Sequence, residues 1–463
     1  MIKAVVGAGG KTSLIKKLAK QYWEQGKKVL VCTTTHMYKE ADSMVDASAE
    51  EIAAELNSKG YAMAGSDKGE KISALPAEVY ETVCAQADVV LVEADGSKHK
   101  AIKFPAAHEP AVPENADEII VVCGLHALGQ PLAEVTHRPE LAAQCLGVSE
   151  DTVITAEHIA KLLKKGYLEP LRQRYPQKKV SVYANHNSSL YQRALTALLE
   201  AEMDVSLIRE EWFCPQPRLF VCGGGHVSKA LATMAHCLDF STVVMDDREE
   251  FVDRKSFPTA DQLICDCFEN LESYLRQGDY HIVVTRGHKD DLTCVQQILK
   301  TNSEYLGMIG SKKKVATAFE LLRQNGFDEE EIEKIHAPIG LNISAVTPAE
   351  IAVSILAEVI QVKNQKHRSS ASKELLSVQE EGVLCMIIGK QGSSPRGVGS
   401  MMFVTKDKTI DSIGGGAVEF AAIEEARRNP SAHICHYNLN KKEENALDMV
   451  CGGSNDVLFL PLR

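Results

Sequence analysis

The sequence predicts a multi-domain α/β protein, and three observations support this prediction. Short apolar runs of strand length alternate with segments of helical periodicity along the 463 residues, which is typical of parallel sheets covered by helices. Three glycine-rich loops follow such apolar runs, as in doubly wound folds. The chain is too long for one hydrophobic core, and its periodicity is interrupted at residues 211–217 and 362–372. We therefore expect three domains, at residues 1–210, 218–362 and 373–463.

Composition and charge argue against several classes of protein. The formal net charge is −12, whereas nucleic-acid binding requires clustered Lys and Arg. No apolar run approaches the length of about 20 residues that spans a bilayer, and the first residues lack the pattern of a signal peptide. The 13 cysteines show no zinc-site spacing, as expected for thiols in a reducing compartment. We expect a cytoplasmic protein without nucleic-acid or membrane partners.

The first domain begins with an apolar strand, a glycine-rich loop and an amphipathic helix. The loop contains Gly7, Gly9 and Gly10 and ends in Lys11 and Thr12. The N–H groups of such a loop point at an anion, the lysine neutralises phosphate oxygens, and the hydroxyl can ligate magnesium. The loop is shorter than the GxxxxGK(S/T) pattern and is similar to the GxxGK(S/T) loops of Mur-ligase-type enzymes. We expect a P-loop-like domain that binds a nucleoside triphosphate with magnesium; the alternative is an ordinary strand-to-helix turn.

Two carboxylates follow a later strand of the same domain. Glu93 and Asp95 come directly after the apolar run at residues 89–92, where a P-loop protein places the acids that hold hydrated magnesium. An exposed turn is the alternative, because Gly96 follows. A polar cluster at residues 33–36 also follows a strand, and chance explains it as well as function does.

The sequence of the second domain predicts a Rossmann-type doubly wound fold. A strand leads into Gly223, Gly225 and His226, with Ser228 in place of the third glycine of GxGxxG, and a later strand ends in Asp246. The glycines permit a tight turn and the approach of a pyrophosphate, while the terminal acid can bind a ribose hydroxyl. The fold is expected on this combination of features, whereas bound NAD(P) is the weaker expectation because a fold does not establish a ligand.

The third domain is expected to be a small α/β module with several exposed, glycine-rich turns. Hydroxyls, a guanidinium fork and backbone N–H groups in these turns can bind an anion such as a pterin phosphate. The candidate residues are Ser393, Ser394, Arg396, Gly414, Gly415 and Gly416. Cys451 precedes two glycines, and its thiolate could contact a metal or carry sulfur or selenium. The alternatives are structural turns and a buried core cysteine.

Several longer segments resemble known families. The segments GAGGKTS, CTTTHM and VEADGSKHKAIKFPAAHEPAVP resemble the YqeC family, which is linked to selenium-dependent molybdenum hydroxylases. Residues 218–362 resemble the Rossmann domain of xanthine dehydrogenase accessory (XdhC/CoxI) proteins. The segments GSSPRGVGSMM, SIGGGAVE and MVCGG resemble the N-terminal signature of that family. In the family this signature precedes the Rossmann part, so the modules stand here in swapped order.

The resemblance implies a chaperone-like maturation factor for a molybdenum hydroxylase. XdhC-like proteins bind molybdenum cofactor, protect it during the exchange of a terminal ligand for sulfur, and deliver it to the apo-enzyme; the YqeC resemblance adds selenium. The implied partners are the apo-hydroxylase and a cysteine desulfurase or selenium donor, and we expect a homo-oligomer. Cys451 would lie near the metal. The rival hypotheses are an NAD(P)-dependent oxidoreductase and a non-catalytic scaffold, and nucleotide hydrolysis or transfer in the first domain stays open.

Overall fold

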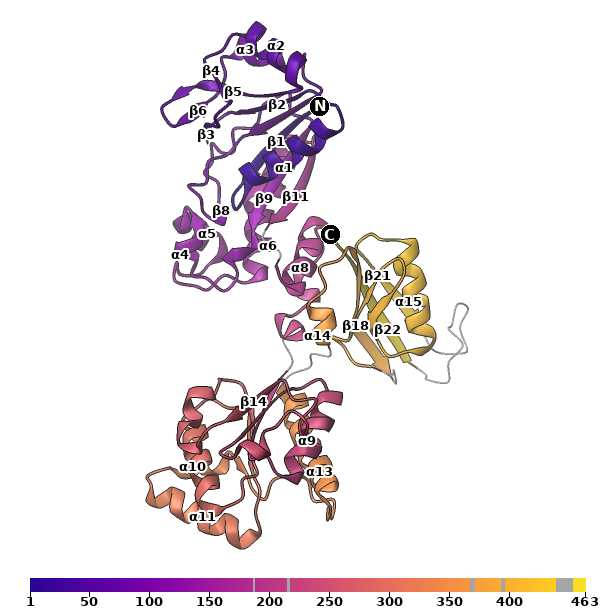
Figure 1. The fold of residues 1–463 in the computed structure, drawn as a ribbon. Coiled ribbons are helices and arrows are strands. Elements are labelled where there is room, and N and C mark those ends of the chain that lie inside the picture. Colours follow the sequence, from indigo (N-terminus) through magenta and orange to yellow (C-terminus); the bar gives the residue numbers. More distant parts are fainter. Residues whose placement is uncertain (186–187, 215–216, 367–370, 393–395, 439–452) are drawn as a thin grey trace.

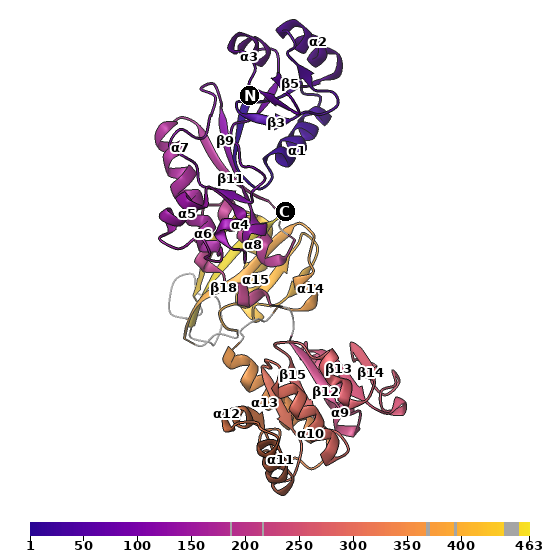
Figure 2. The same ribbon diagram turned by 90° about the vertical axis from the view of Figure 1, so that its left-hand side faces the viewer.

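A computed structural model describes residues 1–463 except 186–187, 215–216, 367–370, 393–395 and 439–452. Within the described residues, the strands form three large sheets and one two-stranded sheet. Figures 1 and 2 show the C-terminal sheet between the N-terminal part and the Rossmann-type part. In the same residues, no helix combines the length and apolar character needed to cross a bilayer.

The N-terminal sheet is mainly parallel and is covered on both faces. Its main path has the order β11-β9-β1-β7-β2-β5-β6-β3. The strands are β1 (Ile2–Gly7), β2 (Val29–Thr33), β3 (His36–Tyr38), β4 (Met44–Val45, paired with β5), β5 (Tyr61–Lys68), β6 (Lys71–Ser73), β7 (Val89–Glu93), β9 (Glu118–Gly124) and β11 (Lys179–Asn185). Val5 belongs to one hydrophobic cluster and its neighbours Ala4 and Val6 to another, because successive side chains of a strand point to opposite faces.

Helices on both faces complete this part of the chain. They are α1 (Lys11–Glu24), α2 (Ala49–Lys59), α3 (Ala77–Cys84), α4 (Leu132–Val135), α5 (Pro139–Leu146), α6 (Ala156–Leu163), α7 (Glu169–Arg174) and α8 (Leu190–Glu200), with the two-stranded sheet formed by β8 (Ile102–Lys103) and β10 (Thr136–His137). Because β1 pairs in parallel with β7, with Val5 opposite Glu93, the loops after the two strands lie at the same sheet edge.

The middle part of the chain is a Rossmann-type domain, as the sequence predicts. Its six strands are all parallel, in the order β14-β13-β12-β15-β16-β17, which is the doubly wound order 3-2-1-4-5-6. They are β12 (Arg218–Cys222), β13 (Ser241–Asp246), β14 (Gln262–Cys265), β15 (Tyr280–Val283), β16 (Tyr305–Met308) and β17 (Ile335–His336). Separate hydrophobic clusters cover the two faces, one containing α9 (His226–Cys237) and α13 (Pro348–Lys366) and the other α10 (His288–Leu299) and α11 (Lys312–Gln324).

The C-terminal part is a five-stranded antiparallel sheet of order β20-β19-β18-β22-β21. Its elements are α14 (Lys373–Leu376), β18 (Gly382–Gly392), β19 (Met401–Val404), β20 (Thr409–Asp411), α15 (Gly416–Arg428), β21 (His433–Asn438) and β22 (Gly453–Leu462). Helix α15 covers one face. The other face contributes Leu384 and Leu460 to the same hydrophobic cluster as Leu195 and Leu198 of α8. The first and last parts of the chain therefore share a core.

One buried arginine joins these two parts. The side chain of Arg193, on α8, is 3% exposed. Its guanidinium donates hydrogen bonds to the carbonyl oxygens of Val378 (2.7 Å), Glu380 (2.6 Å) and Arg463 (3.4 Å). Burial lowers the pKa of Arg193, and the three carbonyls replace the water that the charged group has lost.

We predict that Arg193→Met lowers the free energy of unfolding of the interface by about 1.5–3 kcal/mol, because buried carbonyls lose charge-assisted bonds. Urea unfolding can be followed by the fluorescence of Trp212, which is buried against Gly399 of the C-terminal part, in a Trp23→Phe background. Arg172→Met is the matched control, since Arg172 forms a half-exposed ion pair with Glu202 and should cost less than about 1 kcal/mol. Equal losses in the two variants would contradict the joining role of Arg193.

Candidate functional site

The first glycine-rich loop adopts a backbone that only glycine tolerates. Gly7 and Gly9 have φ values of 88° and 77°, in the left-handed region. A Cβ atom on Gly7 would lie 2.2 Å from the carbonyl oxygen of Val122, and one on Gly9 would lie 2.3 Å from that of Ala101. The loop is therefore pressed against the segments beside β1. Asn185, at the end of β11, also fixes it by donating from Nδ2 to the carbonyl oxygen of Gly9 (2.9 Å).

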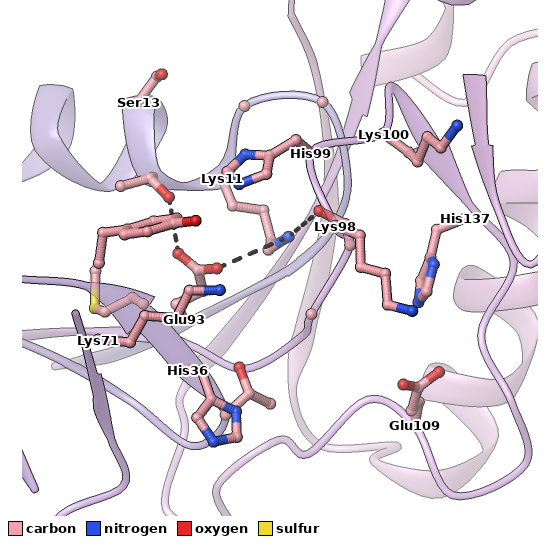
Figure 3. A pocket seen from close by; sticks show the side chains of 18 of the residues that line it. Lys11, Ser13, His36, Lys71, Glu93, Lys98, His99, Lys100, Glu109 and His137 are labelled. Atoms are coloured by element: carbon pink, nitrogen blue, oxygen red, sulfur yellow. Dashed lines mark hydrogen bonds and ion pairs between the residues drawn. The ribbon is translucent and has the colours of Figure 1, made fainter. Parts of the chain in front are cut away.

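Helix α1 begins directly after this loop and points its N-terminus into a cavity (Figure 3). The first N–H groups of an α-helix have no partner within the helix. The N-cap residue, Gly10, has no side chain to cap them. Because the helix dipole adds partial positive charge at the same point, the start of α1 favours an anion.

Lys11 lies over the loop rather than in solvent. Its side chain is 4% exposed, and Nζ donates to the carbonyl oxygen of Gly7 and to Oγ of Ser97, each at 2.9 Å. Nζ also lies 3.9 Å from Oε1 of Glu93. Burial lowers the pKa of Lys11, and the nearby carboxylates offset part of this shift. The ammonium group is thus held where an anion at the helix N-terminus would meet it.

Thr12 and Glu93 lie side by side in the lining of the same cavity. Oγ1 of Thr12 donates to Oε2 of Glu93 at 3.0 Å. Burial raises the pKa of Glu93, while Lys11 and Thr12 oppose that shift. A hydroxyl and a buried carboxylate are hard oxygen ligands of the kind that magnesium prefers, and a cation between them would offset the cost of burying the charge.

The carboxylate of Asp95 is bonded to groups within the protein, and Asp95 does not line the cavity. It is 1% exposed, accepts hydrogen bonds from the N–H of Gly7 (3.0 Å) and the hydroxyl of Tyr167 (2.7 Å), and pairs with the buried ammonium of Lys103. Lys103 also donates to the carbonyl oxygen of Gly96 at 2.7 Å. Of the two predicted magnesium acids, only Glu93 therefore faces the cavity.

The cavity has a volume of about 750 Å³ and a strongly basic lining. Five Lys or Arg side chains and four His side chains line it, against two glutamates. The charged and titratable lining residues are Lys11, His36, Lys71, Glu93, Lys98, His99, Lys100, Glu109, His126, His137 and Arg138. Low-dielectric walls of one charge sign concentrate ions of the opposite sign. The shape and charge suit a ligand that carries several negative charges.

Sequence reasoning missed most of this basic lining. The signal for part of it was the Lys-His-Lys run at 98–100, which follows Gly96 closely. Lys98 and His99 both have positive φ values, 47° and 61°, and such strained backbone is found at functional sites more often than elsewhere. Arg138 comes from a distant segment and is placed by its ion pair with Glu109 (2.9 Å), which no local pattern indicates.

An aromatic surface lies at one edge of the cavity. The rings of Tyr38 and His99 stack with a centroid separation of 5.7 Å and an interplanar angle of 29°. Nζ of Lys71 lies 4.5 Å from the centroid of the Tyr38 ring, and Tyr38 remains 49% exposed. An aromatic pair beside an anion-binding helix start offers a contact surface for a planar heterocycle.

The Rossmann-type loop has a different environment. Gly223 has a φ of 109°, and His226 is exposed at the start of α9. Asp246 is 1% exposed and accepts from the N–H of Gly224 (2.8 Å) and from both Nε (2.9 Å) and Nη2 (3.1 Å) of Arg248. Both carboxylate oxygens of Asp246 are thus bonded within the protein, which disfavours the predicted contact with a ribose hydroxyl.

The segment after Arg248 also approaches this loop. A Cβ atom on Gly224 would lie 2.0 Å from the carbonyl oxygen of Phe251, whereas one on Gly225 would meet nothing within 4 Å. Glycine at position 224 therefore allows the backbone of the loop to pack closely against the backbone at Phe251. The side of the loop at Gly225 is open.

The C-terminal glycine turn is bonded within the protein. Gly414, Gly415 and Gly416 all have positive φ values. Oε2 of Glu419 accepts from the N–H groups of Ile413 and Gly415, each at 3.0 Å. The N–H of Gly414 donates to Oγ of Ser412 (3.0 Å), and the exposed Arg396 donates to the carbonyl oxygen of Ser412 (3.1 Å).

In this arrangement the turn does not fit a pterin phosphate. The carboxylate of Glu419 already accepts the backbone hydrogen bonds that the phosphate would need. Ser393, Ser394 and Cys451, the other residues predicted for this site, lie outside the described residues. Their role stays a prediction.

Three segments of the chain match family models of known proteins. Residues 3–140 match the family model described as YqeC protein, residues 219–359 match the XdhC Rossmann domain, and residues 375–435 match the XdhC and CoxI family. These matches follow one another in that order along the chain.

Individual relatives agree with the family models. The uncharacterized protein YqeB of Escherichia coli K12 is 35% identical over 157 residues, which cover 32% of this chain and 28% of YqeB. The uncharacterized protein YqeC of the same organism is 32% identical over 173 residues, 35% of this chain and 66% of YqeC. A probable xanthine dehydrogenase subunit of Bacillus subtilis 168 is 31% identical over 153 residues, 33% of this chain and 44% of that protein.

A solved structure described as a xanthine dehydrogenase from Bacillus halodurans is 30% identical and covers 34% of this chain and 45% of its own, with a TM-score of 0.31. The chain thus spans between 28% and 66% of the length of the three curated relatives. The predicted resemblance is confirmed: a segment that matches YqeC is followed by segments that match the Rossmann domain of XdhC and the XdhC and CoxI family, in that order.

Proposed function

We propose that this protein assists the maturation of a molybdenum hydroxylase and that its YqeC module binds a nucleoside triphosphate with magnesium. Two findings support the role in maturation. The chain carries both modules of the XdhC family, and a relative of 31% identity is named a probable xanthine dehydrogenase subunit. The partners in this proposal are an apo-hydroxylase and a donor of sulfur or selenium.

One observation carries the nucleotide part: the start of α1 has no side-chain cap and opens into a basic cavity beside Lys11, Thr12 and Glu93. Phosphate oxygens would accept from the first N–H groups of α1 and from the ammonium of Lys11. Magnesium would take the hydroxyl of Thr12 and a carboxylate oxygen of Glu93 as ligands, directly or through water. The base would contact the stacked rings of Tyr38 and His99 at the edge of the cavity.

The rival hypotheses receive less support. A Rossmann-type oxidoreductase that uses NAD typically binds the ribose through an acid, and the acid predicted for this role, Asp246, is paired with Arg248 and the N–H of Gly224. A non-catalytic scaffold does not require a buried lysine and a buried glutamate in one cavity. Whether the nucleotide is hydrolysed or its phosphate is transferred depends on the second reactant that the cavity admits.

We predict that Lys11→Ala weakens binding of magnesium nucleoside triphosphates by about 10- to 100-fold, since a charge-assisted bond contributes about 1.5–3 kcal/mol. Isothermal titration calorimetry with ATP, GTP and CTP measures this directly. Lys20→Ala is the matched control, because Lys20 lies on the same helix and its side chain is 74% exposed. Unchanged affinity in Lys11→Ala for every nucleotide would favour the scaffold hypothesis.

The same titrations, repeated over a range of pH, test the role of Glu93 in magnesium binding. Because burial raises the pKa of Glu93, its carboxyl group takes up a proton at a higher pH than an ordinary glutamate does. The gain in affinity on adding magnesium should therefore be present at neutral pH and be lost as the pH falls through that raised pKa. Glu93→Gln should remove the gain at all pH values. A magnesium effect that survives in Glu93→Gln would show that the metal binds elsewhere.

We predict that the full chain, purified anaerobically from a molybdenum-replete host, carries a molybdopterin mass in native mass spectrometry. Cys451→Ala should reduce the bound fraction if the cysteine lies near the metal, and Lys11→Ala should leave it unchanged. Absence of pterin under saturating supply would contradict the expectation, implied by the XdhC/CoxI resemblance, that the chain binds molybdenum cofactor, and it would leave the nucleotide site as a separate activity.

A further inference from the structure

Three side chains with metal-binding atoms meet in the XdhC/CoxI module, at the end of α15 that lies opposite the glycine turn. Glu425 lies in the last turn of α15, and His433 and Cys435 lie on β21. One ligand atom from each can be chosen so that all lie within 4.8 Å of one another. His433 and Cys435 share one face of the strand because they are two residues apart, and the residue between them, Ile434, is exposed.

The hydrogen bonds of His433 fix which ring nitrogen carries a proton. Nδ1 lies 2.7 Å from the carbonyl oxygen of Ser431, and a carbonyl only accepts, so Nδ1 is the donor. In the neutral ring, Nε2 then presents a lone pair toward Oε1 of Glu425, 3.2 Å away. Two acceptors at that distance need a proton or a metal ion between them.

The hydrogen bond from Nδ1 of His433 to the carbonyl oxygen of Ser431 is of the kind that metal-binding histidines make. Such a histidine typically donates its other N–H to a backbone carbonyl or a carboxylate, which fixes the ring. The His433 ring is also held by stacking on Phe459, with a centroid separation of 4.6 Å and an interplanar angle of 5°. Nε2 of His433 is therefore aimed at one point before any ligand arrives.

Cys435 and Glu425 complete the ligand set. Cys435 is partly buried, and its Sγ belongs to the same cluster of ligand atoms. Oε2 of Glu425 pairs with Arg428, whose side chain is 81% exposed and reaches in from solvent. Oε1 is the oxygen that faces His433.

We propose that Glu425, His433 and Cys435 bind a divalent transition-metal ion of the zinc class, with a fourth coordination position open to solvent or a ligand. Thiolate, imidazole and carboxylate together suit zinc and its neighbours, whereas magnesium and calcium prefer oxygen alone. Three protein ligands with one open position are typical of reactive rather than purely structural zinc sites. The proposal does not depend on the nucleotide site.

The test is a titration of the reduced, chelator-treated full chain with Co²⁺ under anaerobic conditions. The expected result is saturable binding of one ion with a thiolate-to-cobalt absorption band, and loss of that band when Zn²⁺ is added. Cys435→Ser should abolish the band. His433→Gln and Glu425→Gln should each weaken binding by about tenfold or more, with near-ultraviolet circular dichroism confirming that the variants fold.

Two control variants make the result specific. Cys237→Ser removes an exposed cysteine of the Rossmann domain and should leave the cobalt spectrum unchanged. Cys451→Ser should also leave it unchanged, which separates this site from the predicted cofactor cysteine. A wild-type protein without the thiolate band would overturn the proposal and reduce the cluster to an ion pair of His433 and Glu425. A band that survives in Cys435→Ser or disappears in Cys451→Ser would overturn it as well.

Discussion

The buried pair of Asp95 and Lys103 is the interaction on which the candidate nucleotide site depends. Both side chains are removed from water, at 1% and 0% exposure, and such a pair is stable only when further hydrogen bonds satisfy both charges. Asp95 receives them from the N–H of Gly7 and the hydroxyl of Tyr167. Nζ of Lys103 also forms an ion pair with Oε2 of Glu109, at 3.0 Å. One network of hydrogen bonds and ion pairs thus fixes the position of the glycine loop relative to Glu109 in the lining of the basic cavity.

A second constraint concerns how the modules are joined. An antiparallel sheet must bury each of its apolar faces, and the XdhC/CoxI sheet uses α15 for one face and α8 of the first part for the other. The carbonyl bonds of Arg193 fix that contact. The swapped module order is therefore compatible with a single core shared by the first and last parts, with the Rossmann domain inserted between them in the sequence.

Much of the fold was predictable because its signals are local. Parallel strands and glycine loops follow from apolar runs and turn residues, but the partners of charged groups come from distant segments. The role of Asp95 depends on Lys103 and Tyr167, which the motif around Gly96 cannot indicate. By contrast, Arg248 lies two residues after Asp246, and Glu419 follows the glycine turn within one helical turn. These two short spacings are signals that sequence reasoning can use to recognise an acid or an amide that is already bonded.

The first of the three glycine loops is the one proposed to hold the phosphates of a nucleotide, and the function of the YqeC module depends on it. Hydrogen–deuterium exchange mass spectrometry of the full chain, with and without a magnesium nucleoside triphosphate, tests this most directly. We predict protection concentrated at residues 7–13 and 93–100. Protection at residues 223–226 instead, or no protection at saturating nucleotide, would contradict it.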